Sequence, residues 1–106
     1  MSAAAAAAAG LPVRTGHLYK KGGVRRNWLR REVRLGDGAL SYYEGDKQKG
    51  AVALQDVTAC AASTSDSVGA KAKRAHIFEV VTKKRTFYFS AGDDHERDAW
   101  VADVQR

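Results

Sequence analysis

Cysteine and proline are scarce in this chain, whose 106 residues include one of each, Cys60 and Pro12. A single cysteine excludes an intrachain disulfide bond and a cysteine-rich metal site. The longest uncharged run, Met1–Val13, is rich in alanine and is too short and too weakly apolar to span a bilayer. The same run lacks the basic start and the leucine-rich centre of a secretory signal. We therefore expect a cytoplasmic protein.

Residues suited to catalysis or metal binding are few and poorly placed. His17, His76 and His95 do not have the spacing of metal ligands. Cys60 lies among alanines in a predicted strand, which is typical of an inert core residue and not of a nucleophile. We expect no enzymatic activity, no metal site and no cofactor.

The length is that of one domain. Hydrophobic residues make up 44% of the chain and charged residues 28%, a balance typical of a globular protein. We expect residues 1–14 to form a disordered, low-complexity alanine-rich tail and residues 15–106 to form the domain.

Positive charge is concentrated near the start of the domain. The net charge is +6, and residues 14–34 hold eight of the eighteen basic residues but one acidic residue, Glu32. The last fourteen residues are acidic on balance. This segregation favours an anionic partner, such as phosphate head groups, nucleic acid or an acidic protein, over a merely solvated basic face.

Apolar and polar residues alternate from Thr15 to Ser90, a pattern that predicts short β-strands. After Ser90 the period changes to that of a helix, and Asp93 with Glu96 forms a plausible capping box at its start. The sequence predicts seven strands and then one amphipathic helix around Trp100. The expected strands lie near residues 17–20, 28–35, 39–44, 51–54, 57–62, 75–81 and 86–90.

This order of motifs resembles the pleckstrin homology (PH) domain family over about residues 16–106. The resemblance implies a mainly β fold, a seven-stranded barrel or sandwich of two curved antiparallel sheets, closed at one corner by the C-terminal helix. It also implies a core that includes Leu18, Val33, Leu35, Phe78, Phe89 and Trp100. The residues that carry the resemblance are Gly16-x-Leu18-x-Lys20, Gly22-Gly23, Trp28, Arg31, Val33-x-Leu35, Leu40–Glu44, Gly50, Phe78, Arg85–Phe89 and Trp100.

The resemblance further implies a head-group site at the open end of the fold. Lys20 and Arg31 match basic positions of the family's signature, whereas Leu29 stands where a second strand-two base is usual. Tyr42 matches a phosphate-contacting tyrosine, and Lys49 matches a further basic position. The predicted phosphoinositide-binding residues are Lys20, Arg26, Arg31, Tyr42 and Lys49, with Lys21, Arg25 and Lys47 at the periphery.

The alternation of side chains along the strands points to the same site, independently of the resemblance to the family. Lys20 shares a strand face with Leu18, and Arg31 shares one with Val33, so both cations are expected on the apolar face near the glycine turn. Cations on an inward face are costly without an anion. A bound phosphate would account for them, because arginine grips it with two bonds and lysine adds a compact charge.

The sequence therefore predicts a phosphoinositide-binding module that is recruited peripherally to membranes. The alternative is a PH-like adaptor that binds protein without tight lipid binding, and Leu29 favours it. Nucleic acid is not expected, because the chain shows no RNA-recognition signature, recognition helix or zinc finger.

Overall fold

The computed structural model describes residues 13–22, 27–63 and 75–105 and is an antiparallel β structure with one long helix. The predicted seven strands and C-terminal helix are confirmed. The elements are β1 (Arg14–Lys21), β2 (Trp28–Gly36), β3 (Ala39–Glu44), β4 (Lys47–Ala53), η1 (Leu54–Asp56), β5 (Val57–Ala62), β6 (Ile77–Thr82), β7 (Thr86–Ser90) and α3 (Asp94–Gln105). No helix in the described ranges is long and apolar enough to cross a membrane.

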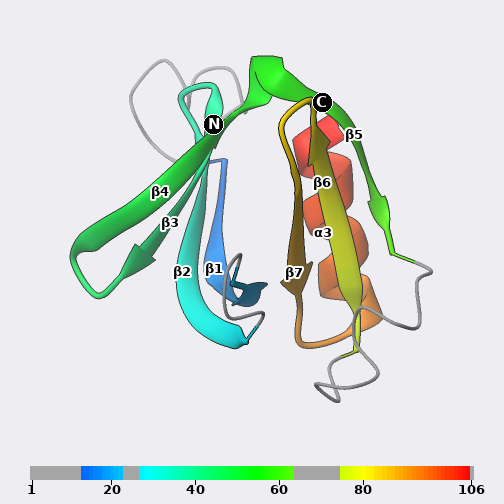
Figure 1. Cartoon of the computed structure of the whole chain (residues 1–106). Coiled ribbons are helices and arrows are strands. Elements are labelled where there is room, and N and C mark those ends of the chain that lie inside the picture. Colours follow the sequence, from blue (N-terminus) through cyan, green and yellow to red (C-terminus); the bar gives the residue numbers. More distant parts are fainter. Residues whose placement is uncertain (1–12, 23–26, 64–74, 106) are drawn as a thin grey trace.

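All seven strands belong to one sheet, in the order β4-β3-β2-β1-β7-β6-β5 (Figure 1). The expected two sheets are therefore two halves of one curved sheet, joined where β1 pairs with β7 at Tyr19 and Lys20. The sheet is not closed, so β4 and β5 remain its two edges.

The turn between β3 and β4 is tighter than the sequence suggested. The strands expected near residues 39–44 and 51–54 leave residues 45–50 as a connection, but Glu44 pairs with Lys47 and β4 begins there. Gly45 makes this short connection possible, because its φ of 59° lies in the left-handed region that glycine adopts without strain. Lys47 and Lys49 consequently lie on a strand instead of in a loop.

The core lies between the curved sheet and the helix. Leu18, Val33, Leu35, Phe78, Phe89 and Trp100 are all buried, each with at most 2% of its surface exposed. The rings of Phe78 and Phe89 stack with their centroids 5.4 Å apart. Cys60 is buried in the same cluster, and burial raises the pKa of its thiol to about 11, so the thiolate is scarce at neutral pH.

The helix is fixed at both ends. The Glu96 amide donates to the Asp93 carboxylate at 2.7 Å, as a capping box requires, while the Glu96 carboxylate accepts from the Gly92 amide at 3.3 Å. At the other end, the Gln105 side chain donates to the Cys60 carbonyl at 2.6 Å. The Gln105 bond joins the end of α3 to β5, and the helix packs against β5 and β6 (Figure 1).

Replacing Trp100 should remove the largest of the fully buried side chains. We expect Trp100→Ala to lower the free energy of unfolding by about 3–5 kcal/mol, because deletion of a buried aromatic leaves a cavity. Chemical denaturation measures the loss, and exposed Gln55→Ala is the matched control that should change little. An unchanged unfolding midpoint for Trp100→Ala would contradict the packing of α3.

Candidate anion-binding site

A pocket of about 230 Å³ lies where β1, β2, β3 and β4 come together. Each of these strands contributes one charged or hydroxyl-bearing side chain to its wall. Lys20, Arg31, Tyr42 and Lys49 line it together with Gly22 and Leu29. The structure thus gathers four of the five predicted principal site residues around one hollow.

Lys20 occupies the most constrained position of the four. Its ammonium group lies 4.6 Å from the centroid of the Tyr42 ring and 5.7 Å from that of Phe87. These contacts stabilise the cation through the electron-rich ring faces. Burial, and then the positive charges of Arg85 and Arg31, lower the pKa of the Lys20 ammonium. The site therefore contains a strained cluster of positive charge that an anion would relieve.

Arg31 and Lys49 share a carboxylate partner at the rim. Glu44 is the last residue of β3, and its Oε2 is 3.7 Å from the Arg31 Nη2 and 3.8 Å from the Lys49 Nζ. The Arg31 guanidinium is largely covered, whereas the Glu44 side chain is 63% exposed. Contacts this long and this exposed are weak, so Glu44 is a partner that a phosphate can displace.

The Tyr42 ring can lie across β4 because the residue opposite it on that strand is a glycine. Gly50 pairs directly with Tyr42 across β3 and β4, and the Tyr42 ring lies over it. A Cβ at position 50 would collide with the ring and the hydroxyl group. Gly50 therefore allows the Tyr42 hydroxyl to reach across the strand toward the pocket.

The remaining predicted residues are distributed around this group. Lys21 turns to the other face of β1, where its ammonium lies 5.4 Å from the centroid of the Tyr88 ring. Lys47 is exposed on β4. Arg25 and Arg26 lie outside the described residues. Leu29 lies directly opposite Lys20 and is 38% exposed, so the position that departs from the signature is on the pocket wall.

Two nearby residues were not predicted from the sequence. Arg85, between β6 and β7, stacks on Phe87 with its Cζ 4.3 Å from the ring centroid and repels the Lys20 ammonium. Glu44 provides the opposing carboxylate. Arg85 is far in sequence from the basic segment of residues 14–34, and Glu44 carries the opposite charge. The one available signal for Arg85 was the basic run Lys83-Lys84-Arg85 in a predicted turn.

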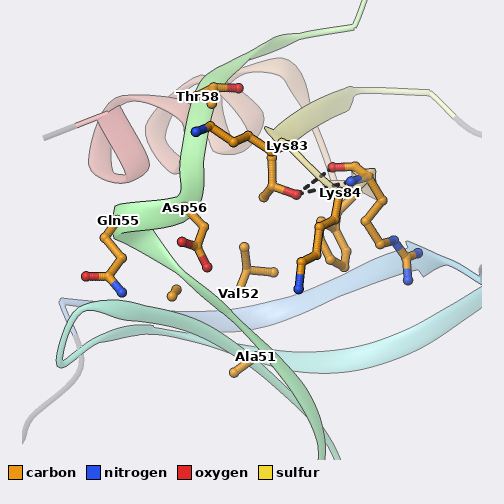
Figure 2. Close-up of a pocket in the computed structure, with 11 residues that line it drawn as sticks. Ala51, Val52, Gln55, Asp56, Thr58, Lys83 and Lys84 are labelled. Carbon is orange, nitrogen blue, oxygen red and sulfur yellow. Dashed lines mark hydrogen bonds between the residues drawn. The ribbon is translucent and has the colours of Figure 1, made fainter.

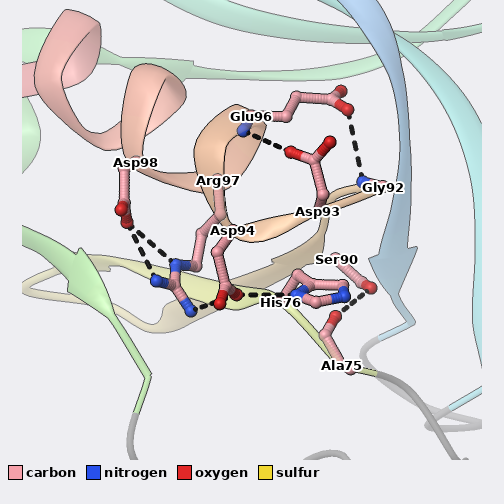
Figure 3. Close-up of polar contacts among 9 residues, drawn as sticks. All are labelled: Ala75, His76, Ser90, Gly92, Asp93, Asp94, Glu96, Arg97 and Asp98. Carbon is pink, nitrogen blue, oxygen red and sulfur yellow. Dashed lines mark hydrogen bonds and ion pairs between the residues drawn. The ribbon is translucent and has the colours of Figure 1, made fainter.

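His76 takes part in a structural contact. Figure 3 shows His76 beside Asp94, with its Nδ1 2.6 Å from the carboxylate, while Arg97 approaches the same oxygen at 3.0 Å. The hydrogen bond with His76, and then the charge of Arg97, lower the pKa of Asp94. In the described ranges, no group of three or more His, Cys, Asp or Glu residues could hold a metal ion.

Comparison with known proteins identifies the family. The family model described as "PH domain" matches residues 12–106. The chain belongs to the PH domain family. It is 34% identical over 96 residues to mouse "Differentially expressed in FDCP 6", covering 88% of this chain and 14% of the relative. It is 32% identical over 98 residues to human pleckstrin, covering 89% of this chain and 27% of the relative.

The structure also matches a solved PH domain that has a ligand bound. The C-terminal PH domain of pleckstrin in complex with D-myo-Ins(1,2,3,4,5)P5 superposes with a TM-score of 0.70 at 25% identity, covering 90% of this chain and 96% of that one. The PH domain described here spans about a quarter or less of the curated relatives' own length.

Substitution of Lys20 should stabilise the free protein. Lys20→Met removes a half-buried cation beside Arg31 and Arg85, and the thioether keeps contact with the aromatic rings. We expect the free energy of unfolding to rise by about 0.5–2 kcal/mol, as it does for other substitutions that remove repulsion between like charges. The measurement is urea denaturation in a buffer without polyvalent anions.

Lys21→Met is the matched control, because the neighbouring lysine lies over Tyr88 on the other face of β1. Its unfolding midpoint should stay the same or fall slightly. A midpoint for Lys20→Met at or below that of the wild type would show that the charge cluster is not strained.

Proposed function

We propose that this PH domain binds the phosphorylated inositol head groups of membrane phosphoinositides and thereby brings the protein that contains it to a membrane surface. The observation that carries the proposal is the shared pocket of Lys20, Arg31, Tyr42 and Lys49. Two of these cations lie on the apolar side of the sheet, where they are costly unless an anion occupies the pocket.

Each side chain has a part in this mode of binding. Arg31 donates to a phosphate through its planar fork, Lys20 and Lys49 supply compact charges, and the Tyr42 hydroxyl donates one further bond. Glu44 leaves its two basic partners when the phosphate enters. The inositol pentakisphosphate complex of the pleckstrin domain supports this class of ligand.

Membrane attachment combines this specific contact with a general attraction. Basic residues near an anionic leaflet contribute about 1 kcal/mol each. Lys21 and Lys47 belong to β1 and β4, the strands that carry Lys20 and Lys49, and the predicted peripheral residue Arg25 and the principal residue Arg26 belong to the basic segment. The domain works by binding and not by catalysis, as a peripheral module at the cytoplasmic face of the membrane.

One observation favours a second candidate function. Leu29 puts an apolar side chain on the pocket wall, directly opposite Lys20, where the family's signature has a base. A pocket with fewer cations grips a polyphosphate less firmly. In this alternative the domain is an adaptor that binds a protein partner without tight lipid binding. Binding to soluble inositol phosphates separates the two functions.

Loss of Arg31 should weaken head-group binding more than loss of any exposed arginine. We expect Arg31→Ala to reduce affinity at least tenfold, because charge-assisted hydrogen bonds contribute about 1.5–3 kcal/mol each. Lys20→Ala should lose nearly as much. Calorimetric titration with soluble inositol phosphates, and sedimentation with vesicles that contain or lack phosphoinositide, measure both effects.

Arg34→Ala is the matched control. Its guanidinium is on the opposite face of β2, where it pairs with Glu32 at 2.5 Å and stacks over Tyr43. Its affinity should remain close to that of the wild type. Equal head-group affinity for the wild type and Arg31→Ala would refute the proposed site and leave the adaptor as the better account.

Two further substitutions should strengthen binding. Leu29→Lys restores a base opposite Lys20, and Glu44→Gln removes the carboxylate that competes for Arg31 and Lys49. We expect an increase of up to about fivefold for Glu44→Gln, the equivalent of a weak exposed ion pair. The same titrations measure both, and a weaker complex with Glu44→Gln would contradict the role given to that carboxylate.

A further inference from the structure

A second and larger pocket, of about 460 Å³, lies at the gap between the two edges of the unclosed sheet. Figure 2 shows Gln55 and Asp56 on one flank, Lys84 on the other and Val52 between them, while Lys83 extends across toward Thr58. Thr58 of β5, the opposite edge strand, also lines it. None of these residues belongs to the proposed head-group site.

The pocket runs along the edge of β4. Ala51, Val52 and Ala53 all line it, although successive side chains of a strand point to opposite faces. A pocket lined by three consecutive residues therefore lies along the backbone edge of the strand and not on one face of the sheet. Among the described residues, β4 pairs with β3 on its other side and has no strand on this one.

The register of β4 shows which backbone groups face the pocket. The Leu54 amide donates to the Gly38 carbonyl at 2.9 Å, on the side of β3. Amide and carbonyl groups alternate between the two sides of a strand, so those of Ala53 and Ala51 point to the open edge. Ala51 thus presents its amide and carbonyl at the open edge, whereas Ala53 presents its amide alone, because the carbonyl of this N-cap residue accepts the first hydrogen bond of η1.

The side chains around this edge define the chemistry of a ligand. Val52 and Phe87 are buried and give the pocket an apolar floor. Exposed Lys83 and Lys84 at the rim outnumber the single carboxylate of Asp56, so the pocket favours negative charge. An alternating chain of apolar and acidic residues would place its two kinds of side chain on the floor and at the rim.

We propose that this slot binds an extended acidic segment of a partner protein, which adds a strand to the open edge of β4. Its backbone pairs with the amide and carbonyl of Ala51 and with the Ala53 amide, its apolar side chains cover Val52, and its carboxylates meet Lys83 and Lys84. The open backbone edge favours a peptide over a lipid head group, because a head group has no ladder of amides and carbonyls to pair with it. The slot and the head-group pocket have no lining residue in common, so both can be occupied at once.

The probe is a fluorescein-labelled octapeptide of alternating valine and glutamate with blocked ends, measured by fluorescence polarisation on the full chain. We expect it to bind, and the matching valine–lysine peptide not to bind. Lys83→Glu with Lys84→Glu should reduce the affinity at least tenfold. Head-group affinity, measured separately with inositol hexakisphosphate, should be unchanged by peptide.

Ala53→Pro tests the backbone contact directly. Ala53 has φ of −68°, which proline adopts without strain, and its amide faces the open edge, so the substitution removes one donor and no internal hydrogen bond. We expect Ala53→Pro to fold as stably as the wild type and to lose peptide binding at least tenfold. Ala53→Ser, which keeps the amide, should bind as the wild type does.

Several results would overturn the proposal. Equal affinity of Ala53→Pro and the wild type for the acidic peptide would exclude strand addition, and so would a lack of any binding. If the protein formed concentration-dependent dimers through β4, the slot would be occupied by a second copy of this chain and not by an acidic peptide. Loss of binding to anionic vesicles in the Lys83 and Lys84 variant, without peptide binding, would make the slot a membrane contact.

Discussion

The structure depends on the junction at Lys20, where the two halves of the sheet meet. β1 pairs with β2 along its whole length but with β7 through Tyr19 and Lys20 alone. Lys20 therefore lies both at the boundary of the core and at the mouth of the pocket, between the rings of Tyr42 and Phe87. Its methylene chain continues the apolar surface, while its ammonium group remains near enough to solvent to meet a ligand.

The open sheet gives the domain two different surfaces. Where the strands converge, side chains from β1 to β4 surround a small basic pocket suited to a compact polyanion. Where β4 and β5 fail to pair, backbone groups stay available beside a longer slot. The two proposed ligands differ accordingly, because one surface offers side-chain charge and the other offers the edge of the sheet. The helix α3 lies against β5 and β6 and anchors that part of the sheet.

Much of this arrangement could be predicted from the sequence, because a strand has a strict two-residue period. Leu18 and Val33 fix which face is buried, and that places Lys20 and Arg31 on the same face before any coordinates are known. Contacts between strands distant in sequence could not be found in this way. Glu44 meets Arg31 and Lys49, and Arg85 acts on Lys20, only because strands distant in sequence lie side by side, which alternation alone does not define. The tight turn at Gly45 depends on one left-handed residue, and the open edge of β4 depends on how far the sheet curls.

The central claim is that the positive charges around Lys20 are held close together so that a polyanion can bind among them. The most direct measurement is an NMR titration of the Lys20 side-chain ammonium with pH, in the free protein and with saturating inositol hexakisphosphate. We expect the pKa of Lys20 to lie below the usual lysine range in the free protein, because of burial and the nearby Arg85 and Arg31. The ligand should then raise it, because a bound phosphate favours the charged form. A Lys20 pKa that is ordinary in the free protein and unchanged by the ligand would contradict the account.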